Sequence, residues 1–184
     1  YKDGSKYEGE YVNHAREGLG TFLNEFGNIY TGFWQDNERH GYGMQEYNEG
    51  NKYCGQWKKD AKHGYGTSWY KDGGVFTGEY LEGLRTGKGI YTYPSGNQYD
   101  GEWKNGVRNG FGIYRYCSGE EYYGDWVDDL RTGFGTYIGA DGSKYEGEWS
   151  QGLKHGEGTL VNGNENYKGS FVSGKKHGKG KIVF

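Results

Sequence analysis

The chain has 184 residues and a formal net charge of −3; only 32% of its residues are hydrophobic, while 18% are aromatic and 38 are glycine. This composition excludes an ordinary aliphatic core, and the small net charge gives no general argument for nucleic-acid or membrane binding. No apolar run approaches the length of a membrane span, so we expect a cytoplasmic chain, associated with the cytoskeleton or peripheral to a membrane.

The first six residues are predicted to be the end of a preceding repeat. Tyr1-Lys2-Asp3-Gly4 matches Tyr70-Lys71-Asp72-Gly73, which closes a later repeat, and the sequence does not begin with Met. We therefore expect the chain to be part of a longer protein.

The rest of the chain repeats one pattern, Tyr30-Thr31-Gly32-Phe33-Trp34 followed by His40-Gly41-Tyr42-Gly43. The pattern starts at residues 7, 30, 53, 76, 99, 122, 145 and 167, with a period of 23 residues and a last step of 22. A fixed period of this size is typical of a repeat array, in which each unit buries its apolar face on its neighbours. Residues 7–184 are predicted to form one array of eight repeats.

Each repeat is predicted to be a β-hairpin. A strand of about six residues begins at the leading aromatic, as in residues 99–104, and turn-forming residues follow. The second strand carries the Gly-x-Gly, as in residues 110–116, and no helical period occurs. The sequence thus predicts an all-β fold, an elongated single-layer antiparallel β-meander solenoid.

Strand parity explains why glycine and aromatic residues recur together. Pairing within a hairpin is expected to place Gly101 opposite Gly112 and Trp103 opposite Gly110, all on one face of the sheet. Large rings would then cover backbone that has no side chains, as in the aromatic rescue of glycine. Such a sheet needs no second layer to bury apolar area.

The repeat resembles the MORN (membrane occupation and recognition nexus) repeat. The family pattern is matched most closely by Tyr53-Cys54-Gly55-Gln56-Trp57 with His63-Gly64-Tyr65-Gly66, and by residues 145–149 with 155–158. The resemblance is strongest to the cytoskeletal MORN proteins of apicomplexan and kinetoplastid parasites. It implies a scaffold that binds cytoskeletal or membrane-associated proteins and forms a homodimer.

Catalysis has little support in the sequence. Histidines recur at one repeat position just before Gly-x-Gly and are predicted to be structural: His40, His63, His155 and His177. No phosphate-binding loop motif is present, so we expect no enzyme activity and no cofactor. Cys54 and Cys117 lie in different repeats, which makes an intramolecular disulfide unexpected; a zinc site shared between two chains through Cys or His is the open alternative.

One basic residue stands nine residues after each leading aromatic: Arg16, Arg39, Lys62, Arg85, Arg108, Arg131, Lys154 and Lys176. We expect this column along an edge of the ribbon, partly neutralised by Asp36, Glu82 and Asp128. Positive charge without facing acids is expected at Lys62, Lys168, Lys175, Lys176, Lys179 and Lys181, which are candidates for binding anionic lipid or an acidic partner. The alternative function is a phosphoinositide-binding module that uses these lysines or, as the MORN resemblance implies, a regulatory arm of a larger lipid-signalling enzyme.

Two apolar sets are candidates for protein contact. Between the paired glycines stand Tyr42, Tyr65, Phe111 and Phe134, which form a partner-binding stripe if they are exposed, or else cover the second face of the sheet. The last strand ends in the apolar run Ile182-Val183-Phe184 and is expected to leave an unpaired edge, which invites pairing with a second copy. The predicted homodimer interface consists of Phe171, Ile182, Val183 and Phe184.

Overall fold

The computed structural model describes residues 2–183, and every regular element in them is a β-strand. The chain divides into two compact units, residues 1–94 and 95–184. The strands of the first unit are β1 (Lys6–Val12), β2 (Ala15–Leu23), β3 (Ile29–Gln35), β4 (Glu38–Glu46), β5 (Lys52–Lys58), β6 (Ala61–Trp69), β7 (Val75–Leu81) and β8 (Leu84–Thr92). Those of the second are β9 (Gln98–Lys104), β10 (Val107–Arg115), β11 (Glu121–Val127), β12 (Leu130–Ile138), β13 (Lys144–Ser150), β14 (Leu153–Asn162), β15 (Glu165–Val172) and β16 (Lys175–Val183).

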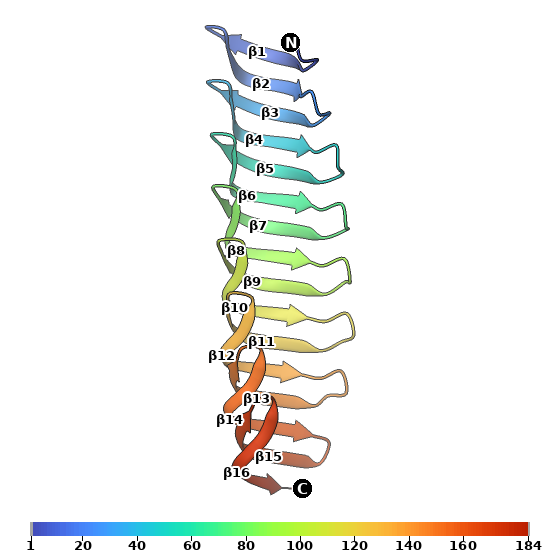
Figure 1. Cartoon of the computed structure of the whole chain (residues 1–184), viewed down its shortest axis with the longest axis vertical. Helices are drawn as coiled ribbons and strands as arrows, with labels where there is room; N and C mark the ends of the chain where they lie inside the picture. The colour runs from blue at the N-terminus through green and yellow to red at the C-terminus, as the bar shows by residue number, and fades with distance from the viewer. Residues whose placement is uncertain (1, 184) are drawn as a thin grey trace. The chain divides into compact units, whose positions relative to one another are not determined.

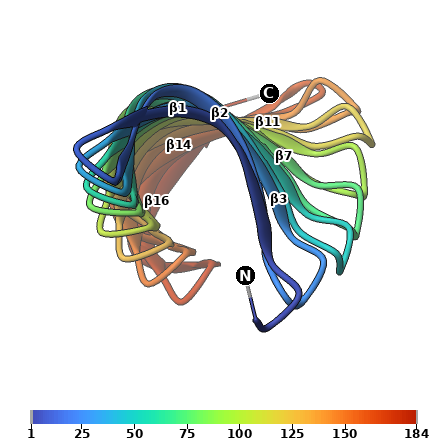
Figure 2. The ribbon, with the colours of Figure 1, turned by 90° about the horizontal axis from the view of Figure 1, so that it is seen from above.

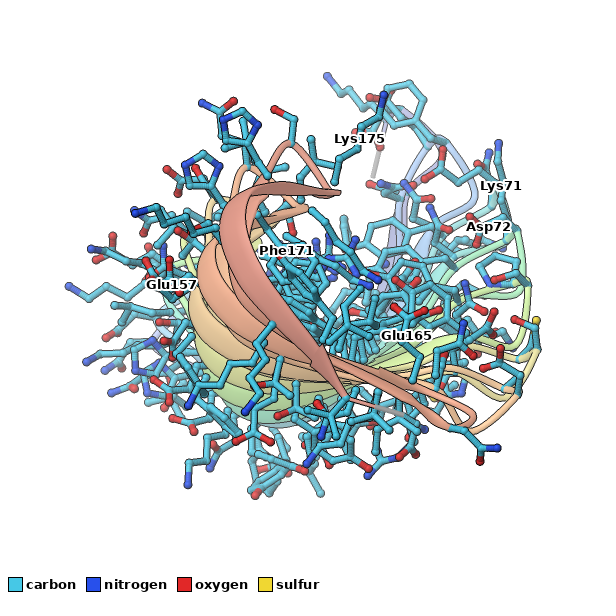
Figure 3. All side chains as sticks on the ribbon, turned by 90° about the horizontal axis from the view of Figure 1, so that it is seen from below. Lys71, Asp72, Glu157, Glu165, Phe171 and Lys175 are labelled. Carbon is cyan, nitrogen blue, oxygen red and sulfur yellow. The ribbon has the colours of Figure 1, made fainter. Side chains whose placement is uncertain are left out.

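Within each unit every strand pairs antiparallel with the strands that precede and follow it in the chain (Figure 1). The predicted all-β single-layer meander is confirmed. The strands are bent, so that the sheet of each unit has a concave inner face and a convex outer face (Figure 2). Side chains stand on both faces: Phe171 points into the concavity and Glu157 points away from it (Figure 3).

The turn inside each hairpin has two residues with positive φ, as at Asn105 (φ 50°) and Gly106 (φ 87°). Positive φ at both positions is the requirement of a type I′ turn, whose twist matches that of the flanking strands. Asn, Asp and Gly tolerate this conformation at low cost, which explains why they recur at these positions.

The register of the second strand differs from the prediction. Trp103 lies opposite Arg108 and not opposite Gly110, because the register shifts between the turn and the Gly-x-Gly. Gly110 has φ 95° and lies in the resulting β-bulge. It faces Trp126 of the next repeat instead, so Trp126 lies between Arg131 of its own hairpin and Gly110 of the preceding one.

The expected pairing of Gly101 with Gly112 is confirmed, and the ring of Tyr99 covers it. A Cβ atom on Gly101 would lie 2.5 Å from the Cα atom of Gly112 and 2.6 Å from the Tyr99 hydroxyl oxygen. No other residue fits at these positions without moving backbone or ring. The rings of the leading aromatic residues therefore pack directly on the glycine pairs.

The seated rings form a continuous chain of edge-to-face contacts within each unit. Tyr30 meets Trp34 of its own repeat at 5.1 Å between ring centroids and Trp57 of the next repeat at 5.5 Å. The same alternation runs through the second unit from Trp103 to Tyr167. Each such pair contributes about 0.5–1.5 kcal/mol beyond the burial of its area.

We expect the substitution Gly55→Ala to lower the free energy of unfolding by about 3 kcal/mol, because its Cβ atom would meet the Gly66 Cα atom at 2.5 Å and the Tyr53 hydroxyl at 2.6 Å. Urea denaturation measures the loss. The matched control is Gly83→Asn, a turn position with φ 85° and open space, where the second repeat carries Asn37. The control should change stability by less than about 0.5 kcal/mol; equal effects of both substitutions would contradict the seating of rings on glycine.

Candidate functional site

The basic column follows the hairpin turns, each cation being the second residue of its strand, and its side chains lie over the aromatic rings of the concave face. The Cζ atom of Arg39 is 4.3 Å from the centroid of the Trp57 ring, and that of Arg131 is 4.5 Å from the Trp149 ring. The β-bulge causes this placement. It brings the cation opposite the tryptophan of its own hairpin in the strand register, and the cation then lies over the aromatic ring of the next repeat. A cation over an aromatic face is attracted by the ring quadrupole.

Arginines of the column also hold the turn of the following repeat. Arg39 forms an ion pair with Asp60 (Nε to Oδ1, 2.8 Å) and donates a second hydrogen bond to the Asp60 carbonyl oxygen at 2.9 Å. Arg108 binds Asp129 in the same way, again 21 residues further on. The acids expected to face the column form no ion pair with any described residue: Asp36, Glu82 and Asp128. For both arginines the paired acid is thus the second turn residue of the next repeat. Its distance from the arginine along the sequence is constant, at 21 residues.

Lys62 occupies the column without an acidic partner among the described residues. Its ammonium group lies 4.7 Å from the Tyr53 ring centroid and donates a hydrogen bond to Ser68 Oγ at 3.2 Å. Ser68 is buried and its Oγ is 2.7 Å from the Tyr80 hydroxyl. Burial, with a contribution from the Arg39 guanidinium, lowers the pKa of Lys62 to about 8.

The inner face of the second unit carries a hollow of about 410 Å³. Its lining includes Arg131, Lys154, Tyr116, Tyr137 and Trp149. A second hollow, lined in part by the same Tyr116 and Arg131, adjoins it. The sequence reasoning missed the two tyrosines, although Tyr137 recurs in register with Tyr91 and Tyr114.

The outer face carries the predicted partner-binding stripe. Its four members are 53–60% exposed: Tyr42, Tyr65, Phe111 and Phe134. Tyr42 and Tyr65 belong to the first unit, and Phe111 and Phe134 to the second. Gln56 lies between Tyr42 and Tyr65: it is the register partner of Tyr42, and its Oε1 accepts a hydrogen bond from the Tyr65 N–H at 2.8 Å. The sheet therefore leaves these rings uncovered and fixes their backbone.

The lysines near the C-terminus lie on and beside β16, the last strand of its unit. Lys168 and Lys181 are direct register partners on neighbouring strands. Lys176 forms an ion pair with Glu165 and lies over the Tyr167 ring on the inner face. The other members, Lys175 and Lys179, are exposed.

The residues predicted for the homodimer interface differ in exposure. Phe171 is 1% exposed, with its ring against Tyr145 and Tyr167 of its own chain. Ile182 and Val183 are 46% and 50% exposed, and Phe184 lies outside the described residues. The homodimer stays a prediction, with Ile182 and Val183 as its accessible residues.

Both cysteines are exposed and free of disulfides. Within residues 2–183 no group of three or more His, Cys, Asp or Glu side chains is arranged to hold a metal ion. The alternative of a zinc site shared between two chains stays a prediction. The described part of the chain also has no helix that is long and apolar enough to span a bilayer.

Comparison with known proteins finds one family. The model of the MORN repeat matches residues 7–23, 30–52, 53–75, 76–98, 99–121, 122–144, 145–165 and 167–184. No protein of curated function matches the chain in sequence.

Solved structures with a similar fold include domains of the protein SAS-4, also named CPAP. The TCP domain of Drosophila melanogaster SAS-4, in complex with a proline-rich motif of Ana2, has a TM-score of 0.52 and 14% identity, covering 96% of this chain and 94% of that one. The TCP10c domain of Drosophila melanogaster Sas-4 has a TM-score of 0.48 and 13% identity, covering 98% of both chains. At these identities the likeness concerns the fold alone.

We expect Lys62 to make stability rise with pH. The unfolded chain holds this proton up to about pH 10.5, while the folded chain loses it near pH 8. Between these values the unfolded state binds more protons, so raising the pH favours the folded state. The substitution Lys62→Met should raise stability at pH 7 and remove this part of the pH dependence, as measured by urea denaturation across the range. Lys58→Met, on an exposed site, is the control; a parallel pH profile for both variants would contradict the assignment.

Proposed function

This chain belongs to the MORN-repeat family, and we propose that it is a non-catalytic scaffold whose outer face binds extended, proline-rich segments of partner proteins. The observation that carries the proposal is the exposure of the outer aromatic stripe, Tyr42 and Tyr65 in the first unit and Phe111 and Phe134 in the second. Aromatic side chains held on a rigid surface lose little entropy on binding and dominate protein interfaces. The inner rings are already buried in the chain's own core, which leaves the outer ones for a partner.

The spacing of the stripe suits an extended ligand. Tyr42 and Tyr65 stand on β4 and β6, two strand spacings or roughly 10 Å apart. A polyproline II helix repeats every three residues, about 9.3 Å, and its fixed backbone loses little entropy on docking to aromatic side chains. Prolines three residues apart would therefore meet successive rings. The similar fold of Drosophila SAS-4 was solved with a proline-rich motif of Ana2, which supports a ligand of this kind. The identity of the partner, cytoskeletal or membrane-associated, stays a prediction from the family resemblance.

A peptide-display library selected on this chain should enrich sequences with proline at every third position. For a selected peptide that binds the first unit, the affinity measured by calorimetry should fall about tenfold or more in the double variant Tyr42→Ser, Tyr65→Ser. The fold should be unaffected because both side chains are exposed. Phe26→Ser, an exposed ring in a loop, is the matched control. Selected peptides without proline, or equal binding by all variants, would contradict the proposal.

Strand β16 favours a second candidate function, the binding of anionic lipid. Lys168, Lys179 and Lys181 lie together on the outer face at β15 and β16, and each such lysine contributes about 1 kcal/mol near an anionic membrane. The predicted homodimer would use the same strand through Ile182 and Val183. The dependence on salt concentration distinguishes lipid binding from homodimer formation. It screens attraction to a membrane, but it also screens the repulsion between the lysines that two copies of β16 would bring together.

Flotation with phosphatidylinositol-phosphate vesicles should therefore show binding at low salt that is lost at high salt, and lost in the variant Lys168→Glu, Lys179→Glu, Lys181→Glu. The control variant carries Lys6→Glu, Lys58→Glu and Lys71→Glu, all on the first unit.

For the homodimer, light scattering should give a mass of about twice 20.8 kDa. The dimeric fraction should increase at high salt, and the variant Ile182→Asp should have the mass of a single chain. Salt-resistant flotation would contradict lipid binding through these lysines, and a single-chain mass at every salt concentration would contradict the homodimer.

A further inference from the structure

The cations on the inner face of the second unit differ in what neutralises them. Arg108 has Asp129, and Lys176 has Glu165. The two cations between them, Arg131 and Lys154, form no ion pair with any residue in the described part of the chain. On the inner face of this unit, the two cations without an ion pair are therefore neighbours.

The cause is visible in the sequence of the turns. The second turn residue of a repeat faces the cation of the preceding repeat: its backbone N–H donates to the carbonyl oxygen of that cation, from Asp129 to Arg108 and from Gly152 to Arg131. Gly174 donates to Lys154 in the same way. Aspartate at this position supplies the carboxylate that pairs with the cation, whereas glycine cannot. Repeats seven and eight have glycine there, so the turn offers Arg131 a carbonyl oxygen, that of Gly152 at 2.9 Å, but no carboxylate.

These two cations line the hollow of about 410 Å³, together with Tyr116, Tyr137 and Leu153. Lys154 lies 5.8 Å from the centroid of the Tyr137 ring. Burial, with the nearby Arg131 guanidinium, lowers the pKa of Lys154, so the two charges stand in a partly desolvated place where an anion would stabilise both. One acid, Glu120, also lines the hollow, and its carboxylate accepts a hydrogen bond from Ser118.

We propose that this hollow binds a carboxylate-bearing segment of a partner protein. The carboxylate lies between the Arg131 guanidinium and the Lys154 ammonium group, and the apolar part of the segment packs on Tyr137 and Leu153. This inference rests on the proposed scaffold function and adds a second contact, on the opposite face from the proline-binding stripe. A guanidinium offers a carboxylate two parallel donors, which fixes the orientation of the ligand.

The shape of the sheet favours a peptide over a membrane. The hollow is on the concave face, the face into which Phe171 points in Figure 3. A bilayer is flat on the scale of one strand, so its headgroups do not reach inside such a concavity, while a single extended chain can lie along it. The lysines of the outer face described above are a separate surface.

The probe is a capped hexaglutamate peptide, followed by the NMR signal of the Trp149 indole N–H, which lies beneath Arg131 and donates to the Gly135 carbonyl oxygen at 3.0 Å. The signal should shift on titration, and the affinity should fall about tenfold or more in Arg131→Gln, Lys154→Gln. The sharper variant is Gly152→Asp, Gly174→Asp, which restores the carboxylate that Asp60 and Asp129 supply elsewhere. It should keep or raise stability and abolish binding of the peptide. The matched control, Gly83→Asp, makes the same change in the first unit and should bind normally.

Unchanged binding in Gly152→Asp, Gly174→Asp would overturn the proposal, as would the absence of any shift in the wild-type chain. Inorganic phosphate that shifts the same signal at equal anion concentration would show a general anion site and overturn the peptide assignment. Competition by anionic vesicles would do the same in favour of a membrane. Because none of these variants touches the outer stripe, loss of hexaglutamate binding with retained proline-peptide binding separates this inference from the proposed function.

Discussion

The contact of an aromatic ring with a bare pair of glycines is the constraint on which the rest of the structure depends. A single β-layer has no second sheet to bury its apolar side chains, so the rings must lie flat against their own sheet. Only glycine leaves room for this: a Cβ atom on Gly55 would come within 2.6 Å of the Tyr53 hydroxyl oxygen. The phenols are buried, which raises their pKa, as for Tyr53, whose hydroxyl donates to the Gln56 carbonyl oxygen at 2.9 Å.

The cations of the basic column cover the packed rings, so they have a structural role whether or not they bind a ligand. Arg39 covers Trp57 and holds Asp60 of the next turn, so one side chain links two successive repeats. A lysine cannot form the same fork, and a glycine in the turn removes the acid. Small changes at two repeat positions therefore decide whether a cation forms an ion pair with the next turn, as Arg39 does, or has no ion pair among the described residues, as Arg131 has none.

The bent single layer gives the protein two chemically different faces. The inner face combines buried rings with half-buried cations, a surface suited to carboxylates held in partly desolvated surroundings. The outer face presents isolated rings such as Tyr42 and Tyr65 at the spacing of alternate strands, a surface suited to extended apolar segments. Because side chains alternate between the two faces along each strand, the two proposed binding surfaces share no side chain.

The sequence by itself determined the period, the hairpins, the absence of a second layer and the Gly101–Gly112 pairing, because spacing along the chain and strand parity are local properties. It also singled out the four rings of the outer stripe, which are exposed in the structure. Only the tertiary structure decided where the basic column lies, because the bulge at Gly110 shifts the register and moves Trp103 opposite Arg108. It likewise decided that a cation meets the turn 21 residues later, a contact between repeats that no pattern within one repeat specifies. This contact shows that Arg131 and Lys154 have no acidic partner among the described residues.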